Sequence, residues 1–198
     1  MKSSLETYLK EHPKKFLIFD LDHTLARLEI DWSTYRREIF DTVATFDKQL
    51  SEEVPFVSFA GLELANRAIK KHGEFARRKI NSFVEEYELT HYHGYSPNNE
   101  LLDFIRSQRS LYTYYIWTSN MKKTFNEFVE KEKLSGIFST IIDRDTAPLL
   151  KPEIDGFNLI RKPQTKLDEF LMIGDNFTDE GAAKNAHIDF YKVNYFSK

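Results

Sequence analysis

Two aspartates that directly follow a short apolar run are the residues best suited to chemistry in this 198-residue sequence. Asp20 and Asp22 come after residues 15–19 (KFLIF), which read as a buried strand. Two neighbouring carboxylates repel each other unless a cation compensates them, and Mg²⁺ prefers carboxylate oxygens. An aspartate can also attack phosphorus to form an acyl-phosphate, while a second carboxyl group moves the proton. The alternative is that both residues only cap a loop or helix.

A second polar group, Thr118, Ser119 and Asn120, closes the apolar run over residues 112–117 (YTYYIW). A hydroxyl and adjacent backbone N–H groups at the end of a strand can hold phosphate oxygens without adding negative charge. The same three residue types also form ordinary turns that cap a following helix. Taken alone, this group therefore leaves both interpretations open.

A lysine and two further aspartates come after later apolar runs. Lys151 can neutralise charge on a transferring phosphoryl group, although alone it also fits an ordinary exposed lysine. Gly174 allows a sharp turn, after which Asp175 and Asp179 would face the same edge as Asp20 and complete an oxygen-rich cation site. An acidic helix N-terminus is the alternative for these two aspartates.

Short apolar runs alternate with helical patterns, which indicates an α/β fold with a parallel sheet. The predicted strands cover residues 15–19, 112–117, 139–143, 170–174 and 189–193. Helices are predicted between them: one with Pro97 in its first turn, one through Phe125 and Phe128, and a shorter one after Thr178. Ligands of such sheets bind beyond the carboxyl ends of the strands, so the polar groups are expected to converge there.

The segment after the first strand has a different pattern. Apolar residues step by three and four in three stretches, as in amphipathic helices: Trp32, Tyr35, Ile39, Val43 and Phe46; Leu62, Ala65, Ala68 and Ile69; Ile80, Phe83, Val84 and Tyr87. Residues 54–59 (VPFVSF) are ambiguous. We predict an all-helical insertion over residues 28–94, within a core formed by residues 1–27 and 95–198.

Composition excludes several classes of protein. The chain has no cysteine, which rules out disulfides, thiol catalysis and zinc–thiolate sites. Its net charge of −3 argues against nucleic acid as the main partner. No apolar run approaches the roughly 20 residues needed to cross a bilayer, and the N-terminus lacks the apolar region of a signal peptide. We therefore expect a soluble cytoplasmic protein with no membrane partner; its oligomeric state is left open.

In this order the polar groups resemble the motifs of the haloacid dehalogenase superfamily of phosphohydrolases. The matching elements are DxDxT at Asp20, the strand-terminal Thr118, Lys151, and GDxxxD at Gly174, and the match covers about residues 14–193. The resemblance implies a Rossmann-like core and an acyl-phosphate mechanism. It also implies that the helical insertion is a C1-type cap over the active site.

Roles in catalysis follow from the resemblance. Asp20 would be the nucleophile and Asp22 the general acid/base. Lys151 would orient the nucleophile and the phosphate. Thr118 would bind phosphate in preference to Ser119, because it falls at the end of the strand.

The resemblance also implies a magnesium site. Mg²⁺ would be held by Asp20, the backbone carbonyl of Asp22, and Asp175. Asp179 would support the water shell of the metal or Lys151.

Three departures from the family pattern stand out. His23 occupies a position where members usually have glycine, and it would either contact the substrate or, as we favour, pack under the cap. His187 replaces another frequent glycine, which we expect the structure to tolerate. Residues 26–28 replace a more usual acidic-Ser pair, so the hinge of the cap is atypical.

The predicted function is Mg²⁺-dependent hydrolysis of a small phosphorylated metabolite. A phosphomutase shares every motif and differs in excluding water from the aspartyl-phosphate. A 2-haloacid dehalogenase is less favoured, because its chemistry does not require an acid such as Asp22. A non-catalytic binding module is also less favoured, because the motif residues are intact: Asp20, Asp22, Thr118, Lys151 and Asp175.

Overall fold

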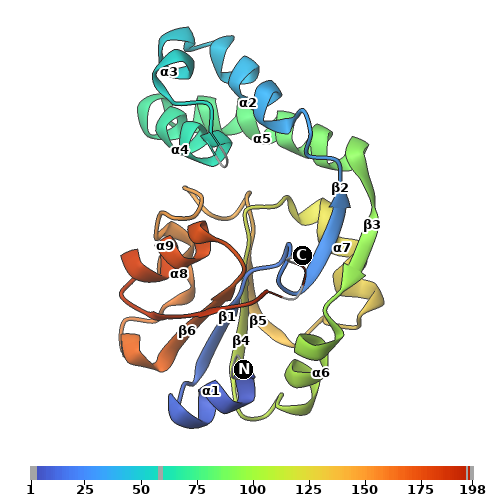
Figure 1. The fold of residues 1–198 in the computed structure, drawn as a ribbon. Helices are drawn as coiled ribbons and strands as arrows, with labels where there is room; N and C mark the ends of the chain where they lie inside the picture. The colour runs from blue at the N-terminus through green and yellow to red at the C-terminus, as the bar shows by residue number, and fades with distance from the viewer. Residues whose placement is uncertain (1–3, 58–59, 195, 197–198) are drawn as a thin grey trace.

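A five-stranded parallel sheet with the order β5-β4-β1-β6-β7 forms the centre of the fold (Figure 1). The computed structural model describes residues 4–57, 60–194 and 196. The strands of the sheet are β1 (Phe16–Phe19), β4 (Thr113–Trp117), β5 (Phe138–Ile142), β6 (Phe170–Gly174) and β7 (Asp189–Lys192). The five predicted strands are confirmed to within one residue at each end.

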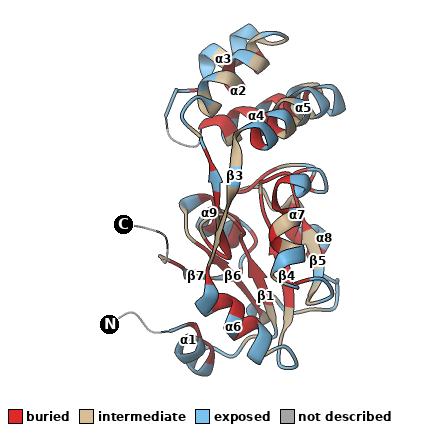
Figure 2. Ribbon diagram, turned by 90° about the vertical axis from the view of Figure 1, so that its right-hand side faces the viewer, coloured by how far each residue is buried: buried red, intermediate tan, exposed pale blue. Residues whose placement is uncertain are grey.

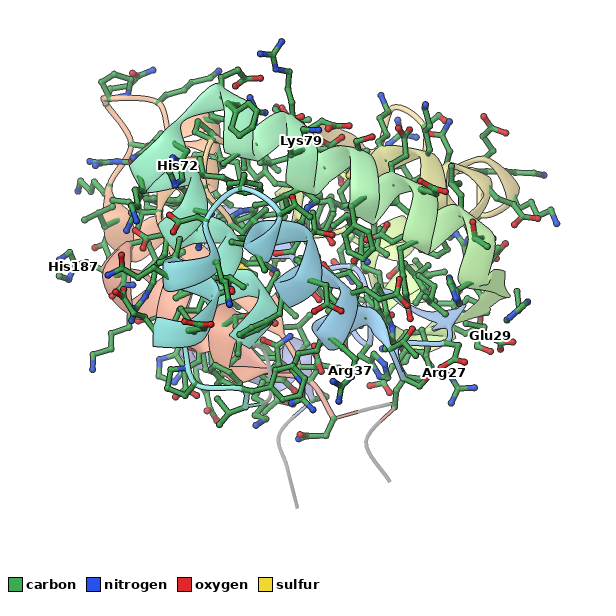
Figure 3. All side chains as sticks on the ribbon, turned by 90° about the horizontal axis from the view of Figure 1, so that it is seen from above. Arg27, Glu29, Arg37, His72, Lys79 and His187 are labelled. Carbon is green, nitrogen blue, oxygen red and sulfur yellow. The ribbon has the colours of Figure 1, made fainter. Side chains whose placement is uncertain are left out.

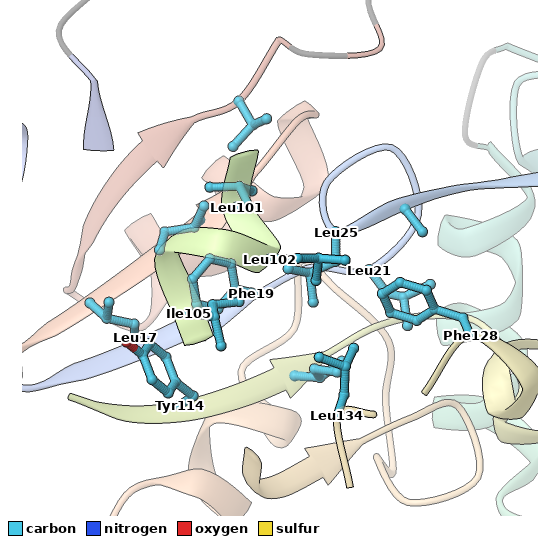
Figure 4. Packing of buried hydrophobic residues seen from close by; sticks show 14 of the residues in the cluster. Leu17, Phe19, Leu21, Leu25, Leu101, Leu102, Ile105, Tyr114, Phe128 and Leu134 are labelled. Carbon is cyan, nitrogen blue, oxygen red and sulfur yellow. The ribbon is translucent and has the colours of Figure 1, made fainter. Parts of the chain in front are cut away.

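Helices cover both faces of this sheet, so the fold is α/β with a Rossmann-like core, as predicted. One face carries α1 (Leu5–Glu11), α6 (Asn99–Ser107) and α7 (Lys122–Lys131), and the other carries α8 (Asp155–Ile160) and α9 (Phe177–Asn185). Leu17 and Phe19 of β1 pack on the first face with α6 (Figure 4), whereas Ile18 packs on the second. The three central strands, β1, β4 and β6, are thereby buried in the middle layer (Figure 2).

Helix α6 begins after Pro97, which its sequence pattern placed in the first helical turn. Pro97 is the last residue of β3 (Tyr92–Pro97) and not part of the first helical turn. The buried Asn98 is the N-cap, and its Oδ1 accepts the Leu101 N–H at 3.3 Å. Its Nδ2 donates to the carbonyl of Thr24 at 3.0 Å, which ties α6 to the loop after β1.

Four helices form a separate layer, here called the helical insertion: α2 (Tyr35–Ala44), α3 (Lys48–Glu53), α4 (Ala60–His72) and α5 (Glu74–His91). Figure 1 shows it beyond the carboxyl ends of the parallel strands. It has its own hydrophobic cluster, which includes Ile39, Leu64 and Ile80. Of the ambiguous segment, residues 54–57 form neither helix nor strand, and residues 58–59 lie outside the described residues.

An antiparallel ribbon connects the helical insertion to the sheet, which differs from the all-helical prediction for residues 28–94. Strand β2 (Ala26–Ile30) pairs with β3, with Leu28 opposite Tyr95. Ala26, Leu28 and Ile30 are buried in alternation, which is the period of a strand. Within the described part of the chain, none of the helices has both the length and the apolar character that crossing a membrane requires.

Candidate active site

The carboxyl edge of the sheet brings a buried lysine between two aspartates. Lys151, in the loop between β5 and α8, donates from Nζ to Asp20 Oδ1 at 2.6 Å and to Asp179 Oδ1 at 2.5 Å. All three side chains are at most 6 % exposed. Removing one partner from such a buried group of charges would leave an uncompensated charge behind. The structure therefore assembles three of the predicted site residues into one fixed unit.

Opposing effects act on the proton affinities of this unit. Burial alone would lower the pKa of Lys151, but Asp179 and Asp20 together raise it above its ordinary value. Burial raises the pKa of Asp20 well above its usual range, and Asp179 adds to this, whereas Lys151 lowers it. Lys151 thus stays charged and favours the ionised form of Asp20, which is the form that a nucleophile needs.

Three carboxylates at this edge can hold a cation. One oxygen each from Asp20, Asp175 and Asp179 lies within 4.8 Å of the others. Asp179 also bonds to Lys151 and accepts the Asn176 N–H at 3.3 Å, so Asp20 and Asp175 are the better placed ligands. Burial, with Asp179 adding, raises the pKa of Asp175. This all-oxygen donor set suits Mg²⁺, which would also relieve the repulsion among the carboxylates.

The turn after β6 explains why these aspartates stand where they do. Asn176 is the N-cap of α9, and its Oδ1 accepts the N–H groups of Thr178 at 2.8 Å and of Asp179 at 3.3 Å. A Cβ on Gly174 would lie 2.4 Å from Asp179 Oδ2, so only glycine allows this close approach. The turn therefore directs Asp179 onto Lys151.

Asp22 lies next to this unit, in the loop that follows β1. Its Oδ1 accepts the backbone N–H of Leu28, in the ribbon, at 2.8 Å. Burial raises the pKa of Asp22 to about 6, although the nearby His23 and the Leu28 bond each lower it. A carboxyl group that titrates near neutral pH can both give and take a proton, as a general acid/base requires.

His23 has a left-handed backbone, with φ of 59°. Side chains with a Cβ rarely adopt this conformation, whereas glycine adopts it freely. Its ring lines the cavity described below and lies 6.2 Å from the ring of Phe196, centroid to centroid. His23 is thus within reach of a ligand and also packed, and its predicted role in substrate binding stays a prediction.

The three residues after β4 are arranged differently from one another. Thr118 is buried, and its hydroxyl donates to Asn120 Oδ1 at 2.9 Å and accepts the Asn120 N–H at 3.2 Å. Ser119 and Asn120 line the cavity, whereas Thr118 is not among its lining residues. The preference for Thr118 over Ser119 as the phosphate ligand therefore stays a prediction.

A cavity of about 430 Å³ separates the sheet edge from the helical insertion. Asp20, Asp22, Lys151 and Asp175 line it on the side of the sheet. The opposite wall is formed by Trp32, between β2 and α2, and by five residues of the helical insertion: Tyr35, Arg36, Gly61, Leu62 and Glu88. A ligand that reaches the carboxylates would therefore be enclosed by residues of both parts of the molecule.

Glu88 is a residue of this wall that sequence motifs did not reveal. It lies on α5, is 1 % exposed, and its Oε2 accepts the Met121 N–H at 2.9 Å and the Thr124 hydroxyl at 2.6 Å. Asn120 Nδ2 lies 3.4 Å from Glu88 Oε1. Glu88 thus caps α7 from the helical insertion and supports Asn120. Its signal is an acid four residues after Val84, within an apolar stripe.

Arg144 is a second such residue. It is 2 % exposed and lines the cavity. Its Nε donates to Asn81 Oδ1 at 3.1 Å and its Nη1 to the carbonyl of Ser119 at 3.2 Å. It therefore joins the loop after β5 to α5 and to the residues after β4, a role that no local sequence pattern indicates.

The chain belongs to the haloacid dehalogenase-like hydrolase family, whose model matches residues 17–193. Its parallel sheet, and the lysine and carboxylates at the carboxyl edge of that sheet, agree with this membership. The match confirms the family resemblance and identifies the protein as an enzyme of that family.

Relatives of the chain include two named phosphatases. Over 180 residues it is 25 % identical to the pyrophosphatase PpaX of Bacillus velezensis, an alignment covering 86 % of this chain and 78 % of that protein. It is 29 % identical over 114 residues to a phosphoglycolate phosphatase of Vibrio cholerae, covering 56 % and 49 % of the two chains. The magnesium-bound hydrolase YfnB of Bacillus subtilis has the same fold, with a TM-score of 0.53, 22 % identity, and coverage of 93 % and 89 %.

Proposed function

We propose that this protein is a Mg²⁺-dependent phosphatase that hydrolyses a small phosphomonoester through an aspartyl-phosphate on Asp20. The observation that carries the proposal is the Lys151 ammonium between Asp20 and Asp179, beside a third carboxylate, Asp175. This arrangement places an ammonium group against a carboxylate that can act as nucleophile, at the edge of the cavity between the two parts of the molecule. The names of the two phosphatase relatives support the same reaction class.

Each residue has a role in the proposed reaction. Asp20 Oδ attacks phosphorus, and Asp22 donates a proton to the leaving oxygen as the ester bond breaks. Asp22 then takes a proton from the water that cleaves the aspartyl-phosphate. Lys151 compensates charge on Asp20 and on the phosphoryl oxygens. Ser119 and Asn120, together with Thr118, would hold the phosphate.

Mg²⁺ would be held by Asp20, Asp175 and the backbone carbonyl of Asp22, and when bound it supplies charge compensation for the phosphoryl group. Asp179 would act indirectly, because its carboxylate bonds to Lys151 and to the Asn176 N–H. The helical insertion would serve as a C1-type cap. A cavity of about 430 Å³ suits a metabolite of modest size, and Arg36 is the cap arginine that lines it.

Phosphate release from p-nitrophenyl phosphate and from a panel of phosphorylated metabolites tests the proposal. We expect turnover with MgCl₂, loss of turnover with EDTA, and a fall of about a thousandfold or more in Asp20→Asn. Asp168→Asn, an exposed position on the far side of the sheet, is the matched control and should retain activity. Reductive trapping with borohydride during turnover should label position 20.

The alternatives give different results in the same assays. Undetectable hydrolysis with Mg²⁺, or hydrolysis that survives Asp20→Asn, would exclude the proposed mechanism. Conversion of a sugar phosphate to its isomer with little free phosphate would identify a phosphomutase. Fluoride release from fluoroacetate by a protein inert toward phosphoesters would identify a dehalogenase.

A further inference from the structure

Asn66, on α4 of the helical insertion, makes two hydrogen bonds to the backbone of Leu150, in the loop between β5 and α8. Its Nδ2 donates to the carbonyl of Leu150 at 2.8 Å, and its Oδ1 accepts the Leu150 N–H at 2.8 Å. Asn66 is 4 % exposed and Leu150 3 %. A primary amide presents an N–H donor and a carbonyl acceptor side by side, so it can satisfy both backbone groups of one residue. The contact is therefore specific for this side chain.

The contacted residue directly precedes the lysine of the candidate active site. The Leu150 side chain packs in the hydrophobic cluster of the helical insertion. The next side chain, Lys151, points to Asp20 and Asp179. The backbone is thus held at Leu150, one residue before Lys151. This contact exists only while the helical insertion lies against the loop.

We propose that Asn66 is a positioning residue for Lys151, through which the placement of the helical insertion sets the geometry of the catalytic lysine. This inference rests on the proposed function. If the insertion moves away, the N–H and carbonyl of Leu150 both lose their hydrogen-bond partner, Asn66. The backbone next to Lys151 is then no longer held in place by this contact. Full activity then requires the closed arrangement seen here, because a small displacement of a catalytic group is costly to the rate.

Other contacts to the same loop supply a control. Three of them join the helical insertion to residues 144–153: Lys70 to Glu153 at 2.6 Å, Arg77 to the carbonyl of Asp145, and Asn81 to Arg144. Lys70 lies on the same helix as Asn66, and its ion pair is half-exposed. Exposed ion pairs contribute little energy. Lys70→Ala therefore removes one contact between α4 and this loop but leaves the hydrogen bonds between Asn66 and Leu150 in place.

Steady-state kinetics on the full chain form the first test. We expect Asn66→Ala to lower kcat about tenfold or more while KM changes by less than about threefold. Lys70→Ala should leave both parameters near their starting values. Lys151→Ala should lower kcat about a hundredfold. In the Lys151→Ala background, Asn66→Ala should have no further effect, because Asn66 acts through that lysine.

Asn66→Asp gives a variant with a switchable defect. The carboxylate can accept the Leu150 N–H but cannot donate to its carbonyl, whereas the protonated acid can do both. We expect kcat of Asn66→Asp, relative to the parent at each pH, to recover as the pH falls. The melting temperature of Asn66→Asp is measured beside kcat. If it matches that of the parent, a recovery of kcat at low pH cannot come from a recovery of folding.

Hydrogen exchange at the Leu150 amide provides a readout that needs no activity. The amide should exchange about tenfold faster or more in Asn66→Ala than in the parent or in Lys70→Ala. Unchanged exchange, or multiplicative losses of kcat in Asn66→Ala with Lys151→Ala, would overturn the inference. A parent protein that hydrolyses no phosphoester would instead refute the proposed function, and exchange would still report whether Asn66 holds Leu150.

Discussion

His23 and His187 are non-glycine residues with left-handed backbones, with φ of 59° and 56°. Both stand at positions noted above as departures from the family pattern that the sequence resembles. A residue with a Cβ incurs a cost of roughly 1–2 kcal/mol in this region. The departures noted in the sequence are therefore departures in side chain alone, because the backbone keeps the conformation that glycine would adopt.

His187→Gly is expected to stabilise the protein. The His187 side chain is exposed and projects away from the ribbon (Figure 3), so its removal breaks no packing. Relief of backbone strain should exceed the extra entropy of glycine in the unfolded chain, for a net gain of about 0.5–1 kcal/mol. Thermal unfolding should show a rise in Tm of roughly 1–4 °C.

His187→Ala is the matched control for that measurement. Alanine removes the imidazole but keeps the Cβ, so the left-handed strain remains and no comparable gain is expected. Equal stabilisation by alanine and glycine would assign the effect to loss of the imidazole and contradict the backbone explanation.

At the scale of elements, α5 of the helical insertion contacts α7 through the buried side chain of Glu88. Glu88 accepts hydrogen bonds at the N-terminus of α7, where the helix dipole favours negative charge. Burial nevertheless raises the pKa of Glu88 to about 7, although Thr124 and Met121 lower it through their bonds. The native protein therefore holds this proton more tightly than the unfolded chain does.

The raised pKa of Glu88 predicts a loss of stability with increasing pH. Stability from the bound proton is fully present below the ordinary pKa of about 4.5 and is lost as pH rises through about 7. Glu88→Gln cannot titrate. The unfolding free energy of Glu88→Gln minus that of the parent should therefore rise by roughly 2–3 kcal/mol between pH 5 and pH 8. Urea unfolding at several pH values measures this difference.

Glu85→Gln on the same helix serves as the comparison. Glu85 forms a largely exposed ion pair with Lys123, and such pairs are weak. Glu85→Gln removes a carboxylate from α5 without touching the hydrogen bonds of Glu88, so it controls for the loss of a charge on this helix. A pH-independent difference for Glu88→Gln would show that Glu88 titrates alike in folded and unfolded chains.

Strands were more predictable than the ribbon for a physical reason. The three central strands of the sheet, β1, β4 and β6, are buried on both faces, so each appears as an apolar run such as residues 170–174. Strand β2 alternates buried and exposed residues over only five positions, and β3 (YHGYSP) has no apolar pattern. The short helices α1, α3 and α8 span two turns or fewer, too little for a clear period.

The candidate site divides in the same way. Asp20, Lys151 and Asp175 follow strands or lie in the loop after one, so local sequence and parallel topology suffice to predict their convergence. Asn66 and Glu88 belong to the opposite wall, and their contacts depend on how the helical insertion rests on the sheet. Each interrupts an apolar stripe, which is a signal of a buried polar contact but does not name its partner.

At the scale of the whole molecule, the hydrophobic cluster of the helical insertion extends into the loops at the carboxyl edge of the sheet. The cluster of the helical insertion includes Met121 and Leu150 from the sheet domain. Both residues neighbour functional segments, one next to Asn120 and the other next to Lys151. The interface between the two parts is thus built from the same loops that carry the candidate site residues.

Magnesium is expected to stabilise the whole chain measurably. A cation that binds only the folded state at a hundredfold above its Kd adds about 2.7 kcal/mol, which corresponds to a rise in Tm of roughly 5–10 °C. Thermal unfolding in MgCl₂ should exceed that in EDTA at matched ionic strength. Asp175→Asn should lose most of this increment, even if relief of repulsion raises its baseline Tm. An increment that is equal in Asp175→Asn would place the cation elsewhere.

The position of β1 at the centre of the sheet bears on how the chain folds. Phe16 pairs with Thr113 on one side and with Phe170 on the other, and the whole helical insertion intervenes before the first of these partners. During synthesis β1 therefore emerges long before either neighbour exists, as an apolar segment with unpaired edges. Such distant pairings slow folding and expose intermediates to aggregation. The four helices of the insertion follow one another in the chain, so their contacts with one another can form before the strand partners of β1 are made.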